Sequence, residues 1–292
     1  MRDLRYRMEL AIVWAFYHAM GSLPPALASA FGGWLGETIG MRIKRTRMAD
    51  AQIATYLPEP DAAKRQKILR GMWNHLGRLV AEYPHLVKGS IDPFVTILGR
   101  EHVHALMKTG KPTLFISGHI GNWELAPKAV GMCGLLLHLV YRPPNNPYID
   151  RFIDRIRSAY AIGHYGKGSD GARGVIRAMK QNESIGMLID QKDNEGALIP
   201  FLGHPAMTML SAARLAIKYN VPIHMMRARR LQGIHYEASI SLVVPEPAYI
   251  PAAGDEEARA LALMEKLNGI ISDWIRETPE QWFWLHRRWP KE

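Results

Sequence analysis

The sequence predicts an α/β fold with a mostly parallel central sheet flanked by helices, preceded by an apolar helical segment at the amino terminus. Short apolar runs of strand length alternate along the chain with longer stretches whose apolar residues recur at helical spacing. Strands separated by helices are typical of an α/β domain with a substantially parallel sheet. With 292 residues, 48% of them hydrophobic, the chain is long enough to bury a large core in one or two domains.

The amino-terminal region is apolar between two clusters of basic residues. Residues 8–40 are largely apolar, and arginines and lysines lie on both sides of them. A simple spanning helix needs roughly 20 predominantly apolar residues, and Glu9, His18 and Pro24 interrupt this run. We therefore expect a monotopic or re-entrant membrane anchor rather than a clean single span, with both basic ends on the cytoplasmic side.

The expected organisation is a helical membrane-anchor or interfacial segment at residues 1–47 and a second domain at residues 48–292. Two alternatives remain for the first segment. One is a secretory signal peptide, because residues 26–30 offer a small-residue cleavage motif after an apolar stretch. The other is a pair of ordinary packed helices.

The elements that follow are predicted from periodicity. The first helix has apolar residues at helical spacing, among them Ile68, Met72 and Leu79, and the last strand alternates as a half-exposed strand does. Helices are expected at 61–88, 124–132, 147–160, 171–180, 210–219 and 261–276, and strands at 113–117, 135–141, 185–189, 221–226 and 236–244.

A histidine and a glutamate follow the strand predicted at 113–117. In open α/β sheets ligands bind in the crevice beyond the strand ends, where His119 would lie. A histidine there can act as a general base, and a carboxylate such as Glu124 can fix its tautomer and stabilise the imidazolium. Because five residues exceed the spacing of neighbours on one helix face, we expect His119 in the turn and Glu124 at the start of the next helix. The alternative is a structural histidine.

Two other predicted strands end in polar residues. Arg142 follows the strand at 135–141, and its planar fork suits carboxylate or phosphate, although a solvated arginine in a turn is the alternative. Asp190 and Gln191 follow the strand at 185–189, where a polar loop would close on the same crevice. The acidic residues of this loop lack the spacing of a calcium site, so we expect no metal.

The overall charge points to an anionic partner. Lysines and arginines number 37 against 27 acidic residues, a formal net charge of +10. Nucleic acid, an acidic membrane surface and an acidic substrate or carrier all remain possible. The tryptophans near the carboxyl end, Trp282, Trp284 and Trp289, suit a membrane boundary or base stacking, but we expect at least two to pack on the core. Cys133 is the single cysteine, so no internal disulfide is possible; we expect it to be buried.

Taken together, these segments resemble the bacterial lipid A biosynthesis acyltransferases, which belong to the lysophospholipid acyltransferase superfamily. The resemblance covers nearly the whole chain, and its matching blocks follow the family's order. These blocks lie at 118–124, 141–143 with 146–147, 190–191, 200–203, 221–222, 279–282 and 286–288.

The resemblance implies transfer of an acyl chain from a thioester, usually on acyl carrier protein, to a hydroxyl of a glycolipid, above all a lipid A precursor. The reaction would take place on the cytoplasmic side of the bacterial inner membrane. His119 would deprotonate the hydroxyl and Glu124 would orient His119, without a covalent acyl-enzyme. The expected partners are acyl carrier protein, the glycolipid and an anionic membrane surface. Neither nucleic acid nor a cofactor beyond the acyl thioester is expected.

The same resemblance implies a set of substrate-binding residues. Arg142 and Arg157 are candidates to hold phosphate on the acceptor or to steady the tetrahedral oxyanion. Asp190 and Gln191 match the family's Asp-Gln block and would shape the site. Asn122 lies within the His-x4-Glu block and is expected to contact substrate.

Three alternatives to this function remain. Related enzymes acylate other glycolipids or aminolipids. A hydrolase acting on the same acyl substrates would use the same base. A basic protein that binds a membrane surface or nucleic acid, without catalysis, would carry His119 and Glu124 as structural residues.

Overall fold

A computed structural model describes residues 2–58, 61–166, 168–244 and 255–290. Within these residues, seven strands form the central sheet in the order β1-β9-β8-β2-β5-β3-β4. Their bounds are β1 (Val95–Leu98), β2 (Leu114–Ser117), β3 (Leu137–Val140), β4 (Ala161–Tyr165), β5 (Ile185–Leu188), β8 (Ile223–Gln232) and β9 (His235–Val244). β2 pairs in parallel with β5 and β8, and only the β8–β9 hairpin pairs antiparallel within this sheet. The mostly parallel sheet is thus confirmed.

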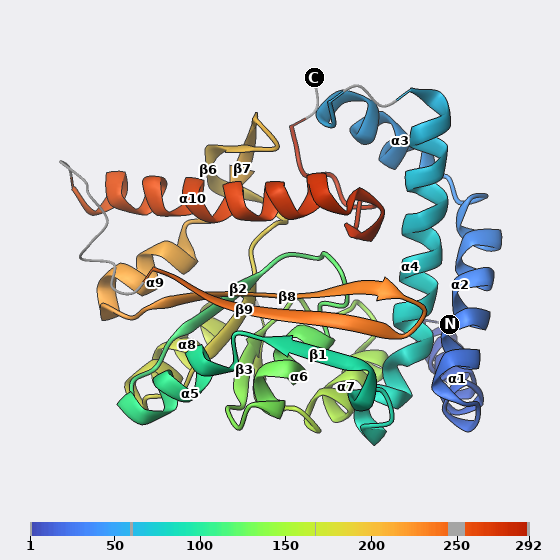
Figure 1. Ribbon diagram of the computed structural model, residues 1–292, viewed down its shortest axis with the longest axis horizontal. Helices are drawn as coiled ribbons and strands as arrows, with labels where there is room; N and C mark the ends of the chain where they lie inside the picture. Colours follow the sequence, from blue (N-terminus) through green and yellow to red (C-terminus); the bar gives the residue numbers. More distant parts are fainter. Residues whose placement is uncertain (1, 59–60, 167, 245–254, 291–292) are drawn as a thin grey trace.

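Helices cover both faces of the sheet (Figure 1). They are α1 (Arg2–Ser22), α2 (Pro25–Gly40), α3 (Arg45–Tyr56), α4 (Ala62–Lys88), α5 (Arg100–Thr109), α6 (Leu125–Met132), α7 (Pro147–Arg157), α8 (Ser169–Lys180), α9 (Ser211–Tyr219) and α10 (Glu256–Glu277). Two short 3₁₀ helices, η1 (Asp92–Phe94) and η3 (Pro279–Gln281), and a separate hairpin of β6 (Lys192–Phe201) and β7 (His204–Thr208) complete the described elements. Figure 1 shows α10 and the β6–β7 hairpin on one side of the sheet, α5 and α6 on the other, and α4 at one end.

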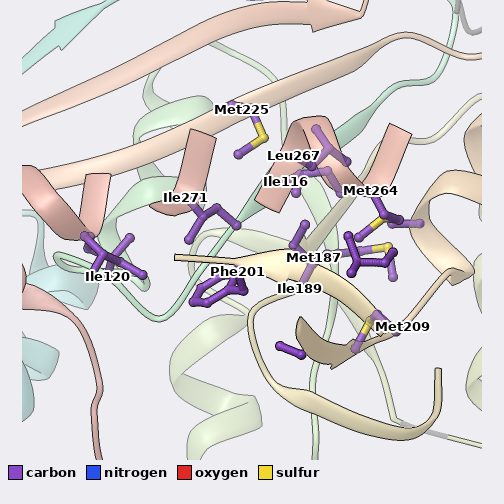
Figure 2. Packing of buried hydrophobic residues seen from close by; sticks show 14 of the residues in the cluster. Ile116, Ile120, Met187, Ile189, Phe201, Met209, Met225, Met264, Leu267 and Ile271 are labelled. Atoms are coloured by element: carbon purple, nitrogen blue, oxygen red, sulfur yellow. The ribbon is translucent and has the colours of Figure 1, made fainter. Parts of the chain in front are cut away.

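The core divides at the sheet because successive strand residues point to opposite faces. On β2, Ile116 joins the apolar cluster beneath α10, which includes Leu267 and Ile271 (Figure 2). Its neighbour Phe115 joins a second cluster, which includes Leu125 of α6. With both faces covered, β2 is buried along its whole length, as an apolar strand of a parallel sheet should be.

The amino-terminal helices differ from the expected membrane anchor. Within the described ranges, no helix combines the length and the apolar character that crossing a bilayer requires, so the prediction of an anchor segment is wrong. α1 carries charged residues in its first half, and α2 packs on α4 by close backbone contact. A Cβ atom at Gly32 would lie 2.5 Å from the Gly77 carbonyl oxygen, so only glycine permits this approach. The alternative of packed helices matches this arrangement, while the division at residue 47, inside α3, stays a prediction.

Candidate active site

A cavity of about 1410 Å³ opens beyond the carboxyl ends of β2, β3 and β5. These strands are neighbours in the sheet, so residues that follow them in sequence meet at one edge. The cavity lining includes polar residues that follow all three strands, namely His119, Glu124, Arg142 and Gln191, together with Arg157 at the end of α7. Asp190 and Asn122 are buried behind this surface.

His119 lies in the turn after β2, and its side chain is 18% exposed. Its Nδ1 lies 2.7 Å from Oδ1 of Asp190, while its backbone N–H donates to Oδ2 of the same carboxylate at 2.7 Å. Asp190 follows β5, the strand that pairs with β2, and its side chain is fully buried. A single carboxylate therefore holds both the ring and the backbone of the histidine.

The Asp190 carboxylate determines which ring nitrogen of His119 carries the proton. Burial disfavours the charged carboxylate, but the charge and hydrogen bonds of His119, with smaller contributions from His286 and Trp282, hold the pKa of Asp190 well below its usual range. An ionised carboxylate only accepts hydrogen bonds, so Nδ1 of a neutral His119 is the protonated nitrogen. The lone pair then resides on Nε2, which lies 3.4 Å from Nε2 of the cavity-lining Gln191.

Glu124 has a different partner from the one predicted. It is the N-cap residue of α6, at the predicted start of this helix, but its oxygens accept from Arg157 Nε at 3.0 Å and Nη2 at 2.5 Å. The hydroxyl of Tyr160 donates to it at 2.6 Å. The assignment of Glu124 as the residue that orients His119 is therefore corrected, because Asp190 occupies that position. Arg157 offers Glu124 a permanent charge and a planar fork, which a histidine cannot.

The Glu124–Arg157 ion pair is firmly ionised. Burial acts to raise the pKa of Glu124, but the charge and hydrogen bonds of Arg157, together with the hydroxyls of Tyr160 and Tyr83, outweigh burial and lower that pKa. The guanidinium of Arg157 also lies over the Tyr141 ring, 5.1 Å from the ring centroid. Arg157 is thus held in place on two sides.

Arg142 contrasts with Arg157. It lines the cavity and is exposed, and within the described part of the chain it forms no ion pair. Its guanidinium is therefore available to an anionic group in the cavity.

Asn122 does not take the predicted place among the cavity-lining residues. It is fully buried, its amide donates to Glu82 and to Tyr236 at 3.3 Å each, and its oxygen accepts the Leu125 N–H at 3.0 Å. These bonds fix the start of α6. Asn122 therefore acts on the shape of the turn rather than on a substrate.

Sequence reasoning missed the role of Trp282. Its indole Nε1–H donates to Oδ2 of Asp190 at 2.8 Å, and its side chain is fully buried. The prediction that at least two tryptophans pack on the core is confirmed, because Trp284 and Trp289 are buried too. The signal that was available is the block at 279–282, which carries the family resemblance without an obvious chemical group.

Potential metal ligands do not gather at this site. Within the described ranges, no group of three or more His, Cys, Asp or Glu side chains is placed to hold a metal ion. The cavity is instead bordered by a carboxylate-paired histidine, an arginine–glutamate ion pair and an exposed arginine.

The fold and the site define an α/β protein with a carboxylate-paired histidine beside a large cavity that has both polar and apolar walls. The model of the family described as bacterial lipid A biosynthesis acyltransferase matches residues 1–291, so the chain belongs to that family. It is therefore an O-acyltransferase of lipid A biosynthesis.

Curated relatives agree with this family. The chain is 22% identical over 270 residues to the lipid A biosynthesis palmitoleoyltransferase of Escherichia coli (strain K12), covering 87% of this chain and 83% of the relative. The same identity and coverage hold for the lipid A biosynthesis acyltransferase of Shigella flexneri. Against the lipid A biosynthesis lauroyltransferase of Escherichia coli (strain K12), the identity is 24% over 282 residues, covering 91% of this chain and 86% of the relative.

Proposed function

We propose that this enzyme transfers a fatty acyl chain from acyl carrier protein to a hydroxyl of a lipid A precursor, with His119 as the general base. The observation that carries the proposal is the tie between Nδ1 of His119 and Asp190 at 2.7 Å, which leaves the Nε2 lone pair beside the cavity. A positioned general base contributes typically about 10²- to 10⁴-fold to a rate.

In the proposed reaction, Nε2 of His119 takes the proton of the acceptor hydroxyl while that oxygen attacks the thioester carbonyl carbon. The C–O bond forms and the carbonyl electrons move to oxygen, giving a tetrahedral oxyanion. When the oxyanion collapses, the C–S bond breaks and the thiolate leaves with the proton from His119. The imidazolium that exists between the two steps is stabilised by the buried Asp190 carboxylate.

Two cavity residues, Gln191 and Arg142, would act on the substrates, and two more would form a wall of the site. Gln191 places its amide 3.4 Å from the base nitrogen, where it would donate to the acceptor hydroxyl or to the oxyanion. Arg142, exposed and unpaired among the described residues, would hold a phosphate of the acceptor. Arg157 and Glu124 would form a fixed wall of the site, because each already satisfies the other.

The acyl chain would lie along the apolar part of the cavity. Val140, Met187 and Leu188 line it from the sheet, and Val175 and Ile176 line it from α8. Apolar walls of this kind exclude water from a fatty chain and stabilise it by burial, at roughly 25 cal/mol per Å² of apolar surface.

The net charge of +10 supports the proposed partners and location. Acyl carrier protein is the proposed donor, an acidic protein whose approach a basic surface accelerates. We place the enzyme at the anionic surface of the bacterial inner membrane, with its active site on the cytoplasmic side. The acyl thioester is the co-substrate, and the proposal includes no resident cofactor.

The test is transfer from labelled lauroyl and palmitoleoyl acyl carrier protein to a tetra-acylated lipid A precursor bearing its inner sugars. Wild type and His119→Ala are compared in detergent. We expect acylated lipid A from the wild type and a loss of roughly 10²- to 10⁴-fold in the variant. His104→Ala is the matched control, because His104 is exposed on α5 and does not line the cavity.

The other outcomes separate the alternatives. Free fatty acid in place of acylated lipid would indicate a hydrolase. Product only with another glycolipid or an aminolipid would reassign the acceptor. Equal rates in wild type and His119→Ala would overturn the role of His119, and binding to vesicles or nucleic acid without turnover would indicate a non-catalytic protein.

A further inference from the structure

Trp282 reaches the catalytic pair from the carboxyl-terminal segment. Oδ2 of Asp190 accepts two hydrogen bonds, from the Trp282 indole at 2.8 Å and from the His119 backbone at 2.7 Å. Oδ1 is left to face Nδ1 of His119. The Trp282 indole, the His119 backbone and the His119 ring thus contact one fully buried carboxylate, and the ring has one of its oxygens to itself.

The backbone around Trp282 also supports the turn that carries His119. The Phe283 N–H donates to the His119 carbonyl at 3.0 Å, and the Gly121 N–H donates to the Gln281 carbonyl at 3.0 Å. Ile120 and Trp282 form an antiparallel bridge between these two bonds. Residues 281–283 therefore lie along the catalytic turn as a short added strand.

The other side of the turn is closed by β8. The Asn122 N–H donates to the Ala228 carbonyl at 2.8 Å, and Gly121 adopts φ +59°. A Cβ atom at Gly121 would lie 2.1 Å from the Ala228 carbonyl oxygen, so only glycine fits between β8 and residues 281–283. The turn has no room to move away from Trp282.

Aromatic neighbours fix the indole ring itself. Trp284 packs edge-on against it at 4.5 Å between ring centroids, His286 lies at 5.1 Å and Phe201 at 5.6 Å. In a close-packed interior the indole cannot turn away from Asp190. Its N–H is thus a preorganised donor to one carboxylate oxygen.

We propose that Trp282 is a positioning residue for the histidine base. By holding Oδ2, its N–H keeps the Asp190 carboxylate from rotating, so Oδ1 accepts from Nδ1–H of His119 and Nε2 remains unprotonated toward the cavity. This inference rests on the proposed function only in assigning His119 as the base. Trp282 itself touches neither substrate, because it does not line the cavity.

The kinetic test is a double-mutant cycle. Trp282→Phe removes the N–H and keeps an aromatic ring, and it is made in the wild type and in Asp190→Asn. Displacing a catalytic group by about 1 Å can cost on the order of 10²-fold, so we expect kcat to fall roughly 10- to 100-fold with KM within about twofold. In the Asp190→Asn background the further loss should be less than about threefold, because the two residues act as a unit.

Trp284→Phe is the matched control. Trp284 is buried in the same segment, and its indole donates to the Pro279 carbonyl at 2.8 Å rather than to Asp190. Its effect on kcat should be the same factor in both backgrounds. An equal loss from Trp282→Phe in both backgrounds would show a purely structural tryptophan and overturn the proposal.

A spectroscopic test is independent of turnover. Histidine ¹⁵N shifts of the intact protein should show His119 protonated at Nδ1, and the Nε2-protonated form should appear in Trp282→Phe but not in Trp284→Phe. An unchanged tautomer would overturn the proposal even if no acceptor lipid were ever acylated. Should Trp282→Phe fail to fold, Trp282→β-(3-benzothienyl)alanine keeps the bicyclic ring without the N–H and carries the same expectations.

Discussion

Two buried carboxylates lie beside the cavity, and their partners differ in kind. Asp190 accepts from His119, a residue that is neutral or charged according to its protonation. Glu124 accepts from Arg157, which is always charged. Both side chains are almost completely buried, and burial disfavours the charged form of each.

The difference between these partners distinguishes a structural ion pair from a pair whose charge can change during a reaction. A carboxylate paired with a permanent cation is neutralised at every stage of a reaction. A carboxylate paired with a histidine instead gains a counter-charge only when the histidine takes a proton, so it favours that event. In the proposed mechanism, the same functional group, equally buried, thus forms a wall of the cavity at Glu124 and supports a general base at Asp190.

The largest expected effect that tests this comparison is Asp190→Asn on turnover. The amide cannot hold Nδ1–H and the backbone N–H as the carboxylate does, so the histidine loses its tautomer and its counter-charge. We expect kcat for acyl transfer to fall between roughly 10²- and 10⁴-fold. Glu124→Gln is the control, and a larger kcat loss in Glu124→Gln than in Asp190→Asn would reverse the two assignments.

The second expected effect is on stability and belongs to the ion pair. Glu124→Gln leaves the Arg157 charge buried without a counter-ion, which should lower the free energy of unfolding by about 3–5 kcal/mol in denaturant titrations. Combining it with Arg157→Met removes both charges, and most of the lost stability should return. A double variant no more stable than Glu124→Gln would contradict the view of this pair as a mutually neutralised wall.

The smallest expected effect is the dependence of the free energy of unfolding on pH, to which the two carboxylates contribute in the same direction. Their pKa values are lowered in the fold, so their contributions are lost only as pH falls below the ordinary values of 4.5 for Glu124 and 3.8 for Asp190. Two histidines behave differently from the carboxylates. Burial, with the charges of His119 and Arg288, lowers the pKa of His286 to about 4, although Asp190 opposes this. Burial and the charge of His102 lower the pKa of His224 to about 4. The ordinary value is 6.5, so between pH 6.5 and 4.5 the unfolded chain binds more protons than the folded one, and acidification destabilises the fold.

This pH effect should be about 1 kcal/mol for each of the two histidines between pH 7 and 5.5. Urea titrations at the two pH values measure it. His224→Gln should remove the contribution of His224 to the change in the free energy of unfolding with pH and leave the contribution of His286. Stability that stays flat until pH 4.5 would mean that the carboxylates alone set the acid limit.

The position of the site followed from the sequence, whereas the pairing within it did not. His119 was predicted in the turn after a buried strand and Glu124 at a helix start, and both lie there. Spacing along the chain suggested that the two would pair. Strand order decides otherwise, because β5 lies next to β2 and brings Asp190 to His119. No periodicity in a single sequence reveals which strands are neighbours.

The strands that escaped prediction lack a strong period or a long apolar run. β1 and β4 are short and half-exposed, and β6 was expected as a polar loop because it begins with Lys192 and further polar residues. The amino-terminal prediction failed for another reason. Apolar composition over residues 8–40 suggested lipid, but the glycines of α2 place their helix against α4.

The contacts that support the turn carrying His119 also bear on when the proposed base becomes ordered during synthesis of the chain. His119 and Asp190 are 71 residues apart, and Asp190 and Trp282 are 92 residues apart. Contacts so distant in sequence form late, because the intervening chain must be ordered before they can close. A ribosome-bound chain that has already released β2 and β5 still lacks the strand and the indole that hold the turn. His119 and Asp190 are therefore both synthesised before the segment that holds them in their final arrangement.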